Sequence, residues 1–272
     1  MLSNVGRRWS WAAFGFGAIG IGACVFDSTD TQLRSPTADA SLPDAPAPVG
    51  EDEEGGLDGG PNDAGWCDGG ATFCDDFDHD PLGARWTSTS IEGGAELALD
   101  PTRASSLPNG LRVKIPEGAP PGTHAHLSRA LEGVGYTETC TVNVLLDALP
   151  ASEVAILALE VGRPATSDVM LTVWVSATVT RLELTAGQDA EAVASGEGPP
   201  LPTGQWVPIL LGAGSQPLGH AAVLRAGDAE VNLSQVNVID YPRTSVLDVG
   251  ARAGDAGSGI VVHYDDVVFT VF

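Results

Sequence analysis

Residues 169–175 read VMLTVWV, a short stretch rich in valine and threonine. β-Branched and aromatic side chains favour strands, because they pack well on a pleated surface. The stretch is also too short for an independent helix, which needs ten or more residues. It therefore predicts a β-strand, and other short stretches rich in β-branched and apolar residues predict strands in the same way.

The same pattern recurs across the C-terminal three quarters of the chain. Gly, Pro, Asn and Asp lie between the stretches and mark turns. Repeated short strands with turn signals between them predict an all-β protein, built as an antiparallel sandwich or barrel. The clearest further stretches are LRVKI (111–115), HAHL (124–127), TCTVNVLL (139–146), WVPILL (206–211) and IVVHY (260–264).

One domain is expected from residue 66 to residue 272. No second linker divides these residues, and a domain of this size buries enough surface to be stable alone. Residues 152–161 are ambiguous, because alanine and leucine also suit a helix. Their neighbours favour a strand there, so the prediction for the whole domain remains all-β.

Composition excludes some classes of partner. The 272-residue chain carries a formal net charge of -23, although charged residues make up only 18% of it. The acidic residues are spread along the whole length. A negative field of this kind repels nucleic acid and anionic surfaces at short range. We therefore expect no nucleic-acid partner.

Residues 1–23 have the layout of a secretory signal peptide. Arg7 and Arg8 precede an apolar, glycine-rich run that is too short to span a membrane as a helix. The run ends in Ile21-Gly22-Ala23-Cys24, which resembles the lipobox of bacterial lipoproteins. This resemblance implies acylation of Cys24 and anchoring in the bacterial cell envelope, at the outer membrane or cell surface. Ordinary cleavage and release as a secreted protein is the alternative.

Residues 24–65 are expected to form a disordered acidic linker. They lack hydrophobic periodicity and contain the acidic run Glu51-Asp52-Glu53-Glu54. Too little apolar surface is available there to offset the ordering entropy of about 1–2 kcal/mol per residue. The segment would act as a tether between the membrane and the domain, and the oligomeric state stays open.

Both ends of the predicted domain resemble one family. Residues 73–78 (FCDDFD), with Trp86, and residues 264–269 (YDDVVF) are similar to the first and last strands of concanavalin A-like lectin/glucanase jelly rolls of LamG type. Residues 203–210 (TGQWVPIL) resemble a tryptophan-containing strand in the middle of such domains. The resemblance implies a β-sandwich of jelly-roll topology. It does not select a function, because the architecture hosts lectins, hydrolases and adhesion modules.

The same resemblance implies a structural calcium ion near the last strand. Asp266, with Asp265 as an alternative, is the position carried over, and Asp76 is a possible companion. Carboxylate oxygens suit Ca²⁺. The alternative is that these carboxylates are solvated or hydrogen-bonded at the strand ends.

Three cysteines remain once Cys24 is acylated, so one thiol is left over. An exported domain favours a disulfide. Cys67 and Cys74 are the local pair, which proximity favours, and Cys140 is the alternative partner for Cys74.

Searches for catalytic motifs fail along any single strand. No Glu-x-Asp-x-Glu cluster is present, and Glu183 is an isolated carboxylate where a retaining hydrolase needs two. His124 and His126 share one strand face but have no third metal ligand nearby in sequence. Trp86, Trp174 and Trp206 suit the core better than a sugar-binding platform.

The sequence therefore predicts a non-catalytic surface lipoprotein that binds a glycan or another envelope ligand. Two alternatives stay open. One is a polysaccharide hydrolase or lyase with an unusual active site, and the other is a structural or adhesion protein that contacts other proteins.

Overall fold

The computed structural model describes residues 71–133, 137–163, 166–186, 191–216, 219–234 and 243–271. These residues form two antiparallel sheets and no α-helix, so the predicted all-β sandwich is confirmed. The ambiguous residues 152–161 fall mostly in the strand β7 (Val154–Arg163). No helix in the described part has the length and hydropathy to cross a membrane. The signal peptide, Cys24, the linker of residues 24–65 and Cys67 lie outside the described residues.

The eight-stranded sheet contains both ends of the described chain. β15 lies between β6 and β4 and also pairs with β1, so the first and last strands run side by side. In order across the sheet, its strands are β13 (Ala229–Ser234), β12 (Gly219–Ala226), β11 (Trp206–Gln216), β6 (Thr137–Leu146), β15 (Ile260–Val271), β4 (Gly110–Ile115) and β3 (Glu96–Asp100), with β1 (Phe73–Asp75) beside β15.

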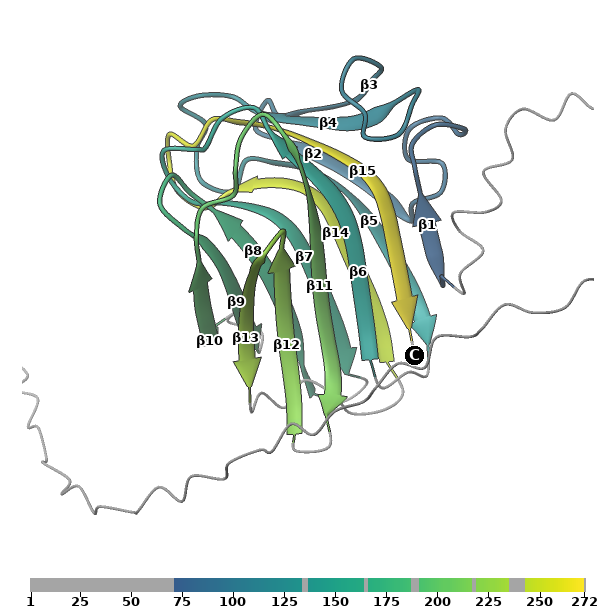
Figure 1. Cartoon of the computed structure of the whole chain (residues 1–272), viewed down its shortest axis with the longest axis vertical. Coiled ribbons are helices and arrows are strands. Elements are labelled where there is room, and N and C mark those ends of the chain that lie inside the picture. The colour runs from purple at the N-terminus through teal and green to yellow at the C-terminus, as the bar shows by residue number, and fades with distance from the viewer. Residues whose placement is uncertain are drawn as a thin grey trace, which may run out of the picture. The chain divides into compact units, whose positions relative to one another are not determined.

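The seven-stranded sheet faces it across the core, and Figure 1 shows β14 between β7 and β5 within this sheet. In order, its strands are β10 (Glu191–Gly198), β9 (Thr180–Ala186), β8 (Thr166–Val175), β7 (Val154–Arg163), β14 (Arg243–Ala253), β5 (His124–Gly133) and β2 (Ser88–Glu92). At one end of this sheet, β7, β8, β9 and β10 pair in sequence order. β14 comes much later in the chain but lies between β7 and β5.

The core follows from side-chain alternation. On β8, Val169, Leu171 and Val173 are almost fully buried, while Met170 and Trp174, which point the other way, are half-buried. The largest buried side chains come from both sheets, among them Tyr264 of β15. Burying each aliphatic side chain stabilises the fold by about 1.5–3 kcal/mol. The side chains at outward positions are therefore not part of the core and are available for contacts with a ligand.

Candidate functional site

The outer face of the seven-stranded sheet, which points away from the core, carries a group of polar side chains. On β5, Ala125 and Leu127 are buried, so His124 and His126 point outward. On β14 the same alternation turns Asp248 outward. Residues directly opposite each other on antiparallel strands share a face. The outward side chains of different strands therefore meet.

The register brings three of these side chains together. β14 pairs with β5 so that Gly250 lies opposite His126 and Arg252 lies opposite His124. Asp248 is two residues from Gly250 on the same face. His126 therefore faces a position without a side chain, with a carboxylate on one side and a guanidinium on the other.

A small pocket of about 50 Å³ forms at this point. His126, Asp248, Arg252 and Met170 surround it, and its floor is made by small residues. Because Ala155, Ala158 and Gly250 contribute no long side chains, the polar groups border a hollow instead of a filled surface. The residues lining it are His126, Ala155, Leu157, Ala158, Met170, Asp248, Gly250, Ala251 and Arg252.

An irregularity in the sheet lies directly below the pocket. The register between β14 and β7 shifts between Val249 and Arg252, and β7 also carries a bulge between Ala155 and Leu157. Bulges bend strands and change the direction of side chains, and they are frequent next to active sites. Both shifts fall at the pocket floor.

Tyr264 of the opposite sheet fixes this irregularity from inside the core. Its hydroxyl lies 2.8 Å from the carbonyl oxygen of Ile156 and 2.7 Å from that of Gly250. Burial raises the pKa of this phenol well above its usual value, so the hydroxyl stays a hydrogen-bond donor. The buried hydroxyl thus links the two strands where their register shifts.

Gly250 cannot be replaced without moving backbone. Its φ is +155°, and an added Cβ would lie 2.3 Å from the carbonyl oxygen of Ala125 and 2.4 Å from the Cα of His126. Real Cβ atoms do not approach backbone so closely. Glycine at this position therefore allows β5 and β14 to approach each other closely beside His126.

The environment of His126 keeps its imidazole neutral. Burial lowers the pKa of His126, and the nearby charges of His124 and Arg252 lower it further, while Asp248 raises it. The net shift is downward. Within the described residues no hydrogen bond occupies its ring nitrogens, so the neutral ring has a nitrogen free to accept a proton.

Two arginines lie over the ring of Trp174, and they differ in whether a carboxylate pairs with them. Arg181 lies 5.4 Å from the ring centroid, donates to Glu153 at 2.9 and 2.7 Å, and also pairs with Glu183. Arg252 lies 5.9 Å from the same centroid. Within the described part of the chain, Arg252 has no carboxylate partner.

Asp248 is the other unsatisfied group. Its Oδ1 is buried and has no hydrogen-bond partner among the described residues. A buried acceptor without a donor costs about 1–3 kcal/mol. The pocket is therefore lined by a proton acceptor, a cation and a carboxylate, which are His126, Arg252 and Asp248. Within the described residues, these three groups form no hydrogen bond with one another. This arrangement is typical of a site that acts on a ligand.

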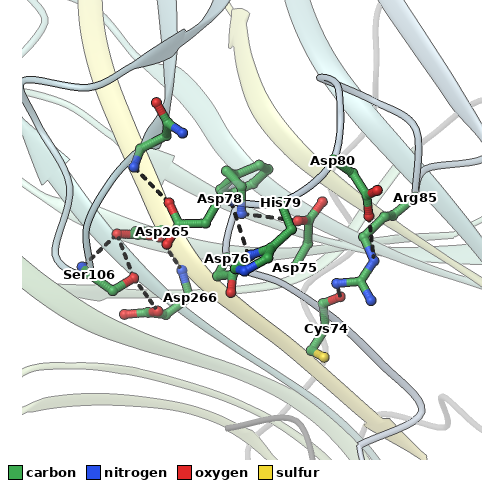
Figure 2. A network of polar contacts seen from close by, with 12 residues as sticks. Cys74, Asp75, Asp76, Asp78, His79, Asp80, Arg85, Ser106, Asp265 and Asp266 are labelled. Atoms are coloured by element: carbon green, nitrogen blue, oxygen red, sulfur yellow. Dashed lines mark hydrogen bonds and ion pairs between the residues drawn. The ribbon is translucent and has the colours of Figure 1, made fainter. Parts of the chain in front are cut away.

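The predicted calcium residues lie on the other sheet and are satisfied by hydrogen bonds. Asp265 is fully buried and accepts from the backbone N–H of Ser105 at 2.7 Å and of Ser106 at 2.9 Å. Asp266 accepts from both serine hydroxyls and from Asn143. Figure 2 shows both carboxylates facing Ser106. This network ties residues 105 and 106 to β15.

Asp76 has separate partners in its own loop. It accepts from the N–H of Asp78 at 3.1 Å and lies 3.7 Å from the imidazole of His79 (Figure 2). In the described residues, no group of three or more His, Cys, Asp and Glu is arranged to hold a metal ion. The hydrogen-bond donors on Asp265 and Asp266 satisfy them without a cation. Calcium binding stays a prediction.

The described residues include Cys140, whose thiol is free, and Cys74, whose predicted partner Cys67 lies outside them. Cys140 is free and fully buried, and burial raises its pKa to about 12. It is therefore not the partner of Cys74 in this structure. Cys67 lies outside the described residues, so the pairing of Cys67 with Cys74 stays a prediction.

The tryptophans also differ. Trp86 is buried, stacks on Phe77 and donates to Asp75, as expected of a core residue. Trp174 and Trp206 are half-buried at outward positions of their strands. The predicted core placement is therefore confirmed for Trp86 and wrong for Trp174 and Trp206, and Trp174 lies beside Arg252 of the pocket.

These features define a class of fold, and comparison with solved structures identifies particular examples. The two antiparallel sheets have the concanavalin A-like jelly-roll arrangement. The endo-β-1,4-glucuronan lyase of the fungus Trichoderma reesei is similar at a TM-score of 0.57 and 12% identity, with 74% of this chain and 96% of that chain covered. Membership of the LamG type stays a prediction.

Two further solved structures match at lower TM-scores. A family 7 alginate lyase in complex with its product matches at a TM-score of 0.49 and 8% identity, covering 62% of this chain and 83% of that one. A glycosyl hydrolase family protein from Mycobacterium fortuitum matches at 0.42 and 18%, covering 73% and 99%. No family model and no curated protein matches the sequence.

The expectation of a non-catalytic glycan-binding module is therefore corrected. The solved structure that the fold resembles at a TM-score of 0.57 is named as a lyase, so the alternative of a polysaccharide hydrolase or lyase fits better. Motifs along single strands do not reveal this group of side chains. His126 was singled out, whereas Asp248 and Arg252 were missed, because they lie more than a hundred residues later and meet His126 only through sheet register.

Proposed function

We propose that this chain is a polysaccharide lyase that cleaves a 4-linked uronate polymer by β-elimination at the His126 pocket. The observation that carries the proposal is the juxtaposition of a neutral imidazole with an unpaired guanidinium, His126 and Arg252, over the pocket floor. The likeness to a glucuronan lyase supports a uronate polymer as the substrate class.

Arg252 would bind the uronate carboxylate. Elimination removes the proton at C5, next to that carboxylate, and the resulting charge must be stabilised in the transition state. A fixed cation aimed at the developing enolate-like charge is an effective stabiliser. Because Arg252 lacks a carboxylate partner among the described residues, its charge is available for the substrate.

His126 would be the general base. The electron pair of the C5–H bond forms a C4=C5 double bond, the C4–O bond breaks, and the C5 proton moves to a ring nitrogen of His126. The imidazolium then returns a proton to the departing sugar oxygen. Asp248, whose charge raises the pKa of His126, stabilises that imidazolium.

Hydrolysis fits this face less well. A retaining hydrolase needs two carboxyl groups about 5 Å apart, one of them ionised as the nucleophile. On this face Glu153 and Glu183 are both bound by Arg181. Asp248 lies beside an imidazole. The proton acceptor and the cation together favour elimination.

The test uses the purified full chain with glucuronan, alginate and a neutral β-glucan. We expect ultraviolet absorbance from the C4=C5 double bond to rise with one of the uronate polymers and not with the neutral glucan. New reducing ends without that absorbance would indicate hydrolysis and contradict the proposal. No cleavage of any uronate polymer would also contradict it.

We also propose that the chain is exported and lipid-anchored through Cys24, with residues 24–65 as the tether. Labelling of growing bacterial cells with an alkyne analogue of palmitate should mark the wild-type protein and not the Cys24→Ala variant. Recovery of the unlabelled wild-type protein in the medium would support simple secretion instead.

A further inference from the structure

A second chain of side chains lies beside the pocket on the same outer face. The hydroxyl of Ser90, on the edge strand β2, lies 2.9 Å from Nε2 of His124. Nδ1 of His124 lies 2.9 Å from the carbonyl oxygen of Gly122. Serine, imidazole and carbonyl thus follow one another in a line that the elimination step above does not use.

The carbonyl decides the tautomer of this histidine. A carbonyl oxygen only accepts, so Nδ1 of His124 must carry the hydrogen that it donates to Gly122. Nε2 then has a lone pair in the neutral ring and accepts from the Ser90 hydroxyl. The hydroxyl proton is therefore directed at a base whose orientation is fixed by a third group. This is the arrangement that activates a serine nucleophile.

We propose that Ser90 and His124 form a nucleophile and base pair that hydrolyses esters, with O-acyl groups on sugar hydroxyls as the substrate class. The choice of an acylated polysaccharide rests on the proposed function, whereas the ester chemistry does not. Ser90 lies half-buried on the last strand of the sheet, so a polymer lying on this face can reach it.

The step balances with water as the only co-reactant. The Ser90 oxygen attacks the acyl carbon while its proton moves to Nε2 of His124. The carbon–oxygen bond to the sugar breaks, and the sugar hydroxyl leaves with that proton. Water, deprotonated by the same imidazole, then attacks the acyl carbon, the bond to the Ser90 oxygen breaks, and the imidazolium returns its proton to that oxygen as the acid leaves.

Arg252 is the register partner of His124 on β14 and lies on the same face. Its guanidinium lies over Trp174 of β8, on the side of β14 away from β2, so it has no assigned role in this step. On the other side, Glu92 of β2 is the register partner of His124 and lies at an exposed position.

The experiment measures release of nitrophenolate from p-nitrophenyl acetate by the full chain. We expect turnover that falls by about 100-fold or more in Ser90→Ala, because the nucleophile is lost. Ser88→Ala is the matched control, since Ser88 lies two residues away on the same strand face and is opposite Ser128 rather than a histidine. Thermal melting of both variants checks that they fold.

A fluorophosphonate reagent gives a readout that does not depend on any variant. Labelling of wild-type protein at Ser90, located by mass spectrometry, supports the pair. Equal ester hydrolysis by the Ser90 and Ser88 variants, or no labelling of Ser90, overturns it. Loss of eliminative cleavage in Ser90→Ala without any ester hydrolysis in the wild type would assign the pair to elimination and also overturn it. The ester assay contains no uronate, so failure of the lyase proposal is recognised separately.

Discussion

Charged groups on the two sheets are paired to different degrees, although each sheet contains buried unsatisfied atoms, such as those of His263 on β15 and Asp248 on β14. On the eight-stranded sheet, Lys114 pairs with Glu96 at 2.9 Å and Arg225 pairs with Glu230 at 2.6 Å. Asp265 there accepts three backbone N–H groups. On the seven-stranded sheet, Oδ1 of Asp248 is buried without a hydrogen-bond partner, and Arg252 has no carboxylate partner, within the described residues.

The difference separates residues that support the fold from residues that are open to a ligand. Paired charges on a sheet surface contribute little either way, about 0–1 kcal/mol each. A half-buried cation and a buried carboxylate oxygen without donors cost stability. Such a cost is expected at a functional site. The unpaired groups Arg252 and Asp248 therefore support the proposed site on the seven-stranded sheet, and the following changes test it.

The largest effect is expected from His126→Ala. Removing the proposed base should lower kcat/KM for uronate cleavage by about 10²–10⁴-fold, the usual contribution of a general base. Initial rates of unsaturated product formation measure this. Arg225→Ala, on the eight-stranded face, should leave the rate unchanged. Equal losses in the two variants would remove the distinction between the faces.

Gly250→Ala should strongly destabilise the protein. The added Cβ would meet the backbone of β5 at 2.3 Å, so we expect a loss of about 3 kcal/mol or more in the free energy of unfolding. Gly257→Ala is the matched control, because Gly257 also has a positive φ, +93°, but open space around its Cβ position. It should cost about 1 kcal/mol. Urea denaturation measures both, and equal losses would show that close approach of β5 and β14 is unimportant.

The Asp265→Asn variant tests a hydrogen-bonded carboxylate on the eight-stranded sheet. An amide has one acceptor oxygen where the carboxylate has two, so donors lose partners and stability should fall by about 1–3 kcal/mol. Burial raises the pKa of Asp265 to about 6, from the ordinary 3.8. Between these values the folded state binds the proton more tightly than the unfolded chain. The stability of the wild type that depends on this group therefore decreases as pH rises from about 4 to about 6.

Asparagine lacks this titration, so the variant should be more destabilising at pH 4 than at pH 7. Denaturation of both proteins across this pH range measures the difference. A difference in stability that does not change with pH would contradict the assignment of this pH dependence to Asp265.

The smallest effect is a shift in the pH profile of cleavage. A base must be deprotonated, so kcat/KM should fall as pH drops through the lowered pKa of His126. Asp248→Asn removes the charge that raises this pKa, so the acid limb should move to lower pH. Arg252→Ala removes a charge that lowers it, so the residual activity should show the limb at higher pH. Shifts in the opposite directions would exclude His126 as the titrating base.

The fold was predictable because each strand carries its own signal. Residues 139–146 and 169–175 alternate between buried and outward positions, and this is visible in one short stretch without knowledge of any partner. The segments 73–78 and 264–269 contain parts of the first and last strands, as the sequence predicted, and these strands, β1 and β15, pair with each other. Local pattern and global fold agree here.

Only part of the candidate site could be predicted from the sequence, and the reason is physical. His124 and His126 share a face by period two, and this could be read from sequence. Their partners on β14 depend on which strand returns between β7 and β5, and periodicity does not specify this. The one available signal was the pattern of Asp248 and Arg252 as polar residues within an apolar strand, at the spacing that turns both outward.

Arg252 has a practical consequence for anyone who assays this protein. A guanidinium without an internal counter-ion takes one from the solution. Acetate or citrate in a buffer should compete with the polymer for this position, and high salt should weaken the attraction by shortening its range. Activity measured in a low-salt amine buffer should therefore exceed that in a carboxylate buffer at the same pH.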